Sequence, residues 1–142
     1  MNRTEENIVS DLSISATIAE YYKLTKPGIA LSISISMLIG FVLGSGSSID
    51  FVLMLHALIG TYLIVSGTSA HNQFIERDLD SLMKRTMLRP LPKKSISARN
   101  GMIFSLTLIF SGLSYLVLIV NPVAGLVSFA TALIYLAMYT PL

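Results

Sequence analysis

The sequence predicts an all-α protein, a polytopic bundle of transmembrane helices with about four spans. Of its 142 residues, 53% are hydrophobic and only 13% are charged, whereas soluble domains carry roughly a quarter charged residues. The mean hydropathy is +0.70. Crossing a hydrocarbon core about 30 Å thick takes about 20 predominantly apolar residues, and the sequence offers several uncharged stretches of that length.

These uncharged stretches run through residues 27–49, 51–75 and 100–142. The last is too long for one helix, and it contains Asn121-Pro122, a pair that favours a turn. We therefore expect spans near residues 28–46, 51–71, 102–120 and 123–140, with a polar loop at 72–100. Together they would form a partial transmembrane domain over residues 21–142, after a partly disordered cytoplasmic tail at 1–20.

The basic residues predict the orientation of the spans. Seven of the ten lie within residues 72–100, and the turns at 44–50 and 121–122 hold none. Because short loops rich in Lys and Arg stay in the cytoplasm, we expect the polar loop on that side of a bacterial inner membrane. Basic residues confined to a loop beside the bilayer favour orientation and phosphate binding over nucleic-acid binding. The absence of cysteine excludes cysteine-ligated metals.

The polar loop opens with acidic and amide side chains at helical spacing. At about 100° per residue, Asn72, Glu76 and Asp80 fall within an arc of about 80° on one face. Such oxygen ligands suit Mg²⁺, which takes one or two carboxylates together with water and phosphate oxygens. A solvated, mutually paired surface is the alternative, but this face begins at the membrane end of a span, where polar groups are costly unless paired. Three basic residues follow and can complete an anion clamp: Lys84, Arg85 and Arg89.

Three other ionisable residues are expected to have no direct part in this chemistry. Asp78 lies about 240° from Asn72 around the helix, so it points away from the ligand face. It is expected to pair with an arginine or to face water. His56 and His71 are interpreted as hydrogen-bonding residues of the second span rather than as ligands.

The run that begins at Asn72 resembles the first aspartate-rich motif of the UbiA-type intramembrane prenyltransferases, Asn-Asp-x-x-Asp-x-x-x-Asp. Asn72, Glu76 and Asp80 hold three of its four polar positions, while Gln73 replaces the first Asp and Glu76 the second. With Gln73 and Glu76 at these positions, the run is similar to the motif of the haem-farnesylating branch of that family. Three further segments agree with that branch: Arg89-Pro90-Leu91-Pro92, Tyr22-Lys23-Leu24-Thr25-Lys26-Pro27 and Tyr135-x-x-x-Tyr139-Thr140-Pro141-Leu142.

The resemblance implies transfer of a farnesyl group from farnesyl diphosphate to a vinyl group of haem b, which gives haem O. It implies Mg²⁺ held by Asn72, Glu76 and Asp80 and bridging the diphosphate, with Lys84, Arg85 and Arg89 binding the diphosphate charge, and substrates that enter from the lipid bilayer. Members of the family are longer and carry a second aspartate-rich motif. We therefore expect this chain to be a truncated, N-terminal portion that lacks a C-terminal half and is inactive alone.

Two alternatives remain. A related UbiA-type enzyme could act on a quinone precursor or another aromatic acceptor, on chlorophyllide or on a glycerophosphate, although Gln73 and Glu76 argue against this. A non-catalytic transport module is the other alternative. Transporters place ionisable groups near the bilayer midplane, whereas the acidic face here lies at the end of a span.

Overall fold

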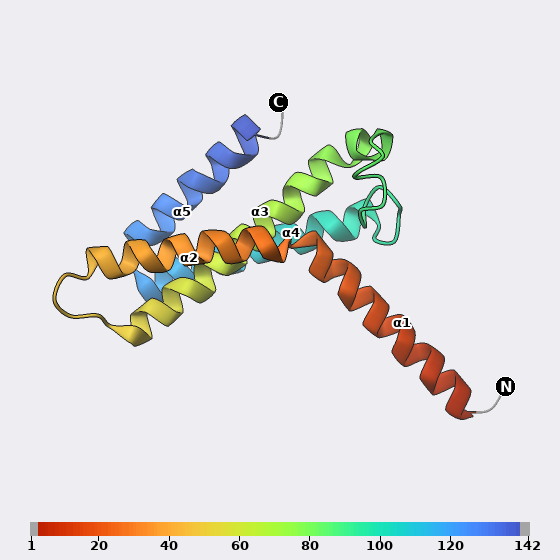
Figure 1. The fold of residues 1–142 in the computed structure, drawn as a ribbon, viewed down its shortest axis with the longest axis horizontal. Helices are drawn as coiled ribbons and strands as arrows, with labels where there is room; N and C mark the ends of the chain where they lie inside the picture. The colour runs from red at the N-terminus through yellow and green to blue at the C-terminus, as the bar shows by residue number, and fades with distance from the viewer. Residues whose placement is uncertain (1–2, 140–142) are drawn as a thin grey trace.

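The apolar stretches of the sequence form helices that lie side by side in a bundle (Figure 1). The structure, a computed structural model, describes residues 3–139 and the side chains of residues 13–137. Its elements are α1 (Arg3–Leu24), α2 (Pro27–Gly44), α3 (Phe51–Leu82), α4 (Ala98–Tyr115) with the π-helical turn η1 (Leu116–Val120), and α5 (Pro122–Ile134) with the π-helical turn η2 (Tyr135–Tyr139). Residues 3–139 contain no strand, so the predicted all-α class is confirmed.

Three helical segments are long and apolar enough to cross a membrane: Pro27–Gly44, Phe51–Leu82 and Ala98–Val120. A shorter apolar helix runs over Pro122–Ala137. Large apolar side chains such as Leu43, Leu118 and Val123 are exposed on their outer faces. Apolar surface on this scale is typical of helices that face lipid, and the chain is an integral membrane protein.

The ends of these helices follow from local chemistry. The Asp50 carboxylate accepts hydrogen bonds from the backbone N–H groups of Val52 and Leu53 and so caps α3. At the Asn121-Pro122 pair, Asn121 is extended and its side chain caps α5. Helix α3 continues to Leu82, so the segment expected as a loop begins as helix. No glycine or proline occurs between Gly67 and Pro90 to stop it sooner.

Helices α3 and α4 approach each other closely at two glycines. A Cβ atom on Gly67 would lie 2.8 Å from the backbone nitrogen of Ile109, and one on Gly112 would lie 2.9 Å from that of Ile64. Small residues allow helix backbones in membranes to pack at such short range. The pair Gly67 and Gly112 therefore sets the spacing between α3 and α4.

Helix α1 occupies most of the segment expected as a tail, and residues 1–2 lie outside the described part of the chain. Figure 1 shows α1 extending away from the bundle, but its last turn is fixed. Leu24 is fully buried in a cluster with Ala70, Leu91 and Ile96. One Glu20 carboxylate oxygen lies 2.7 Å from Lys23 Nζ, and the other lies 2.7 Å from Lys93 Nζ.

We expect Gly67→Leu and Gly112→Leu each to destabilise the bundle by roughly 1–3 kcal/mol, because a larger side chain must push the two backbones apart. Unfolding in mixed micelles, followed by circular dichroism, measures this loss. Gly40→Leu is the matched control, since a Cβ at Gly40 of α2 meets nothing within 4 Å. Equal stability of all three variants would contradict the close-approach interpretation.

Hydrogen bonds from Lys23, then Lys93 and Ser95, lower the pKa of Glu20 from 4.5 to about 2. Because the folded pKa is depressed, the contribution of Glu20 to stability is full above pH 4.5 and is lost as the pH falls towards 2. The stability difference between the parent chain and Glu20→Gln should therefore shrink over that interval. A difference that stays constant from pH 5 to pH 2, measured by urea unfolding, would contradict this assignment.

Candidate functional site

The last turns of α3 carry the polar residues predicted from helical spacing. Asn72 is 1% exposed and Asp80 is 4% exposed, and Glu76, between them on the same face, is half-buried. Polar side chains this deeply buried need hydrogen-bond or ionic partners. Their partners therefore define the geometry of the site.

Asn72 and Glu76 interact along the helix. The Asn72 Nδ2 atom donates to Glu76 Oε2 at 2.8 Å, an i to i+4 contact on one face. This bond directs the amide nitrogen of Asn72 towards the carboxylate. The helical arrangement thus brings an amide and a carboxylate into direct contact.

Asp80 ties the end of α3 to the segment that follows. Its Oδ2 atom lies 2.7 Å from Arg89 Nη1, and its backbone carbonyl accepts a hydrogen bond from Thr86 Oγ1 at 3.0 Å. Since an unpaired buried carboxylate is costly, Arg89 compensates the charge of Asp80. The ion pair folds the basic segment back against the acidic face.

A basic groove of about 520 Å³ adjoins this ion pair. Its polar lining comes from Lys23, Lys26, Gln73, Arg85 and Arg89, from four different parts of the chain. Lys26 is half-buried at the junction of α1 and α2. Burial, and then the nearby Arg89 charge, lower the pKa of Lys26, whereas two acidic residues of the site raise it.

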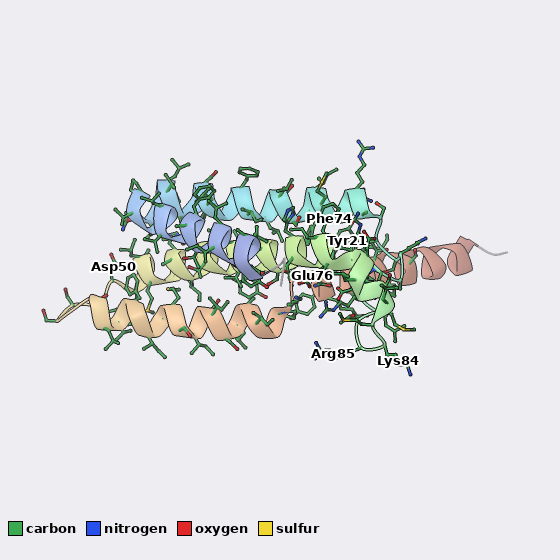
Figure 2. The ribbon with its side chains drawn as sticks, turned by 90° about the horizontal axis from the view of Figure 1, so that it is seen from above. Tyr21, Asp50, Phe74, Glu76, Lys84 and Arg85 are labelled. Atoms are coloured by element: carbon green, nitrogen blue, oxygen red, sulfur yellow. The ribbon has the colours of Figure 1, made fainter. Side chains whose placement is uncertain are left out.

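The structure brings together some of the predicted basic residues but not all of them. Arg85 and Arg89 line the groove, whereas Lys84 is exposed and does not. Figure 2 shows the side chains of Lys84 and Arg85 pointing in different directions. Lys26 also lines the groove, although it lies far from the motif in sequence and helical spacing does not predict it. The one feature of the sequence that could have indicated Lys26 is its position as a basic residue immediately before the first span.

An apolar cavity of about 270 Å³ begins beside the polar face. It lies between α2, α3 and the α5–η2 segment, and Thr68 and Ser69 of α3 line the end nearest Asn72. Tyr135 also lines it, while the side chain of Tyr139 and residues 140–142 lie outside the described part of the chain. A cation-rich groove and an apolar cavity therefore meet at one helix.

The remaining ionisable residues have the partners expected for them. Asp78 is exposed, and its Oδ2 atom lies 3.5 Å from Arg77 Nη2. His71 Nδ1 lies 3.0 Å from Ser105 Oγ, and His56 Nδ1 lies 2.6 Å from Tyr115 Oη. Both histidines are hydrogen-bonded, as predicted, and both partners lie on α4.

The donor set on α3 fits a cation that is shared with a ligand. Among the described residues, no three side chains of His, Cys, Asp or Glu form a metal-binding group. Two carboxylates and one amide remain on the face of Asn72, Glu76 and Asp80. Mg²⁺ completes such a partial set with water and phosphate oxygens, so the residues present are of the types that Mg²⁺ accepts.

Comparison with known proteins gives one family. The model of the UbiA prenyltransferase family matches residues 33–142. The chain is 35% identical over 132 residues to a protoheme IX farnesyltransferase of Koribacter versatilis, covering 91% of this chain and 43% of that protein. It is 36% identical over 129 residues to the enzyme of the same name from Christiangramia forsetii, covering 90% and 42%.

The chain thus spans less than half the length of the curated relatives it matches. No solved structure gives a significant match. The family match includes the whole of α3, α4 and α5, the basic segment that follows α3, and most of α2. The chain belongs to the UbiA prenyltransferase family.

Proposed function

We propose that this chain supplies the diphosphate-binding part of an enzyme that transfers a farnesyl group from farnesyl diphosphate to a vinyl group of haem b, giving haem O. One observation carries the proposal: a buried polar face and a basic groove adjoin an apolar cavity. The similarity to protoheme IX farnesyltransferases supports the choice of substrates.

The two environments suit the two ends of a prenyl diphosphate. Ser69 lines the apolar cavity and Asn72 begins the polar face, and three residue steps along the helix correspond to a rise of about 4.5 Å between them. A diphosphate at the polar face would therefore place its isoprenoid chain at the mouth of the cavity. Apolar walls would also delay attack of water on an allylic cation.

Each polar group has a proposed task. Asn72, Glu76 and Asp80 would hold Mg²⁺, which when bound would supply positive charge beside the leaving diphosphate. Arg85 and Arg89 would share that charge through forked hydrogen bonds, with Lys84 contributing from the exposed side. Donors fixed in a site of low dielectric stabilise such charge more than water does.

The reaction breaks the allylic C–O bond, and its electron pair leaves with the diphosphate. A C–C bond then forms between the farnesyl carbon and the outer vinyl carbon of haem b. Water captures the cation that remains beside the porphyrin and releases a proton. In this scheme the chain's own residues bind and orient the diphosphate and limit early access of water.

The location of the site follows from the same charges. We propose that the segment after α3 faces the cytoplasm of a bacterial inner membrane, because most of the basic residues lie there. Farnesyl diphosphate and haem b would reach the site from the bilayer. Because the curated relatives are longer than this chain, we propose that further helices of the kind they contain would complete the substrate cavity.

The proposal predicts binding that depends on both the diphosphate and the ion. The chain in lipid nanodiscs should bind farnesyl diphosphate with Mg²⁺ present and lose at least about tenfold in affinity with EDTA, since charge-assisted contacts are lost. Isothermal titration calorimetry measures both affinities. Farnesol, which lacks the diphosphate, is the control, and binding of farnesol with equal affinity would reject the proposal.

The acidic face predicts that substitutions on it weaken binding more than a substitution off it. Asn72→Ala, Glu76→Gln and Asp80→Asn should each weaken Mg²⁺-dependent binding of farnesyl diphosphate about tenfold or more, and should severely impair turnover when introduced at the matching positions of a full-length relative. Asp78→Asn is the matched control, because its exposed carboxylate lies off this face. Equal losses in Asp78→Asn and Asp80→Asn would contradict the helical-face arrangement.

A further inference from the structure

A buried side chain of α3 holds the corner between α1 and α2. Gln73 is 2% exposed, and its Nε2 atom donates to the backbone carbonyl of Leu24 at 2.8 Å. Leu24 is the last residue of α1, and only two residues separate it from Pro27, where α2 begins. The Gln73 bond therefore fixes the corner at which Lys26 lies.

The chemistry of this contact explains why an amide suits position 73. The last carbonyls of a helix lack partners within the helix and accept bonds from other groups. An amide can donate to such a carbonyl, whereas an ionised carboxylate can only accept. An aspartate, which the general motif has at this position, would leave the buried Leu24 carbonyl without this donor.

The corner places Lys26 in an unusual conformation. Its φ of 47° lies in the left-handed region, which residues other than glycine seldom adopt. Such a conformation persists where surrounding contacts impose it. Gln73 supplies one of these contacts, and the result is that Lys26 lines the same groove as Arg85 and Arg89.

The groove has an excess of positive charge. No acidic residue is among the described residues that line it. Arg89 is paired with Asp80 and Lys23 with Glu20, but Lys26 and Arg85 have no ion pair within 4.0 Å among the described residues. Cations brought together without matching anions form a site for a multiply charged anion.

Resting on the proposed function, we propose that Lys26 is a further diphosphate-binding residue and that Gln73 is the positioning residue that holds it in the groove. Although Gln73 also lines the groove, its amide nitrogen is committed to the Leu24 carbonyl, and this bond acts on the substrate through Lys26. Gln73 would therefore take no part in holding the metal ion.

The test is a double-mutant cycle on the chain in nanodiscs, with Mg²⁺ and farnesyl diphosphate as the probe. Lys26→Met should weaken binding about tenfold, and Gln73→Met should have a loss of similar size. Because both changes act through one contact, the double variant should bind no more weakly than Lys26→Met. Losses that multiply in the double variant, or unchanged binding in Lys26→Met, would overturn the proposal.

Several control variants distinguish loss of the Lys26 charge from changes in backbone conformation and from loss of folding. Lys94 also has a positive φ, of 62°, and does not line the groove, so Lys94→Met should leave binding unchanged. Lys26→Gly suits the backbone and should lose binding without losing stability, while Lys26→Arg should retain most of the affinity. Wild-type affinity in Lys26→Gly would overturn the proposal.

If Gln73→Met does not fold, Gln73→Asn repeats the test with an amide that is one methylene too short to reach Leu24. Normal binding in a folded Gln73→Asn would overturn the positioning role. A parent chain that shows no Mg²⁺-dependent binding would instead contradict the proposed function itself, so the two failures are distinguishable.

Discussion

The continuity of α3 is the constraint on which the rest of the structure depends. Its 32 residues extend about 48 Å at 1.5 Å per residue, whereas the hydrocarbon core is about 30 Å thick. One unbroken helix therefore spans the membrane and projects beyond it. Because the same helix packs against α1, α2, α4 and α5, its projecting end holds the polar face at a fixed position relative to the whole bundle.

Packing against α4 gives this projecting end its rigidity. Gly67 and Gly112 bring the two backbones together, and the bond between His71 and Ser105 continues the contact to the residue before Asn72. Dispersion contacts and interhelical hydrogen bonds are the forces that join helices in lipid, where the hydrophobic effect between them is absent. The polar face of the site, which starts at Asn72, thus follows directly on the segment of α3 that packs closely against α4.

Local rules predict the parts of this protein that depend on neighbouring residues. Hydropathy predicts the all-α membrane class, and helical spacing predicts that Asn72 and Glu76 share a face, which their hydrogen bond confirms. The groove is different, since Gln73 meets Leu24 across 49 positions of the chain. A contact of that kind depends on how α1 and α2 dock, and periodicity in one sequence carries no information about it. For this reason the sequence pattern did not predict that Lys26 lines the groove.

The pairing of Asp80 with Arg89 gives the resting site an internal balance of charge. A carboxylate that is 4% exposed would be strongly destabilising without a cation, so the protein must supply one from its own basic segment. On the proposed function, diphosphate and Mg²⁺ would enter together, the anion beside Arg89 and the cation beside Asp80. Each buried charge would then exchange one opposite partner for another, and neither would be left unpaired. An acidic face and a basic groove that share this ion pair can therefore bind their substrate without the desolvation cost of an isolated charge.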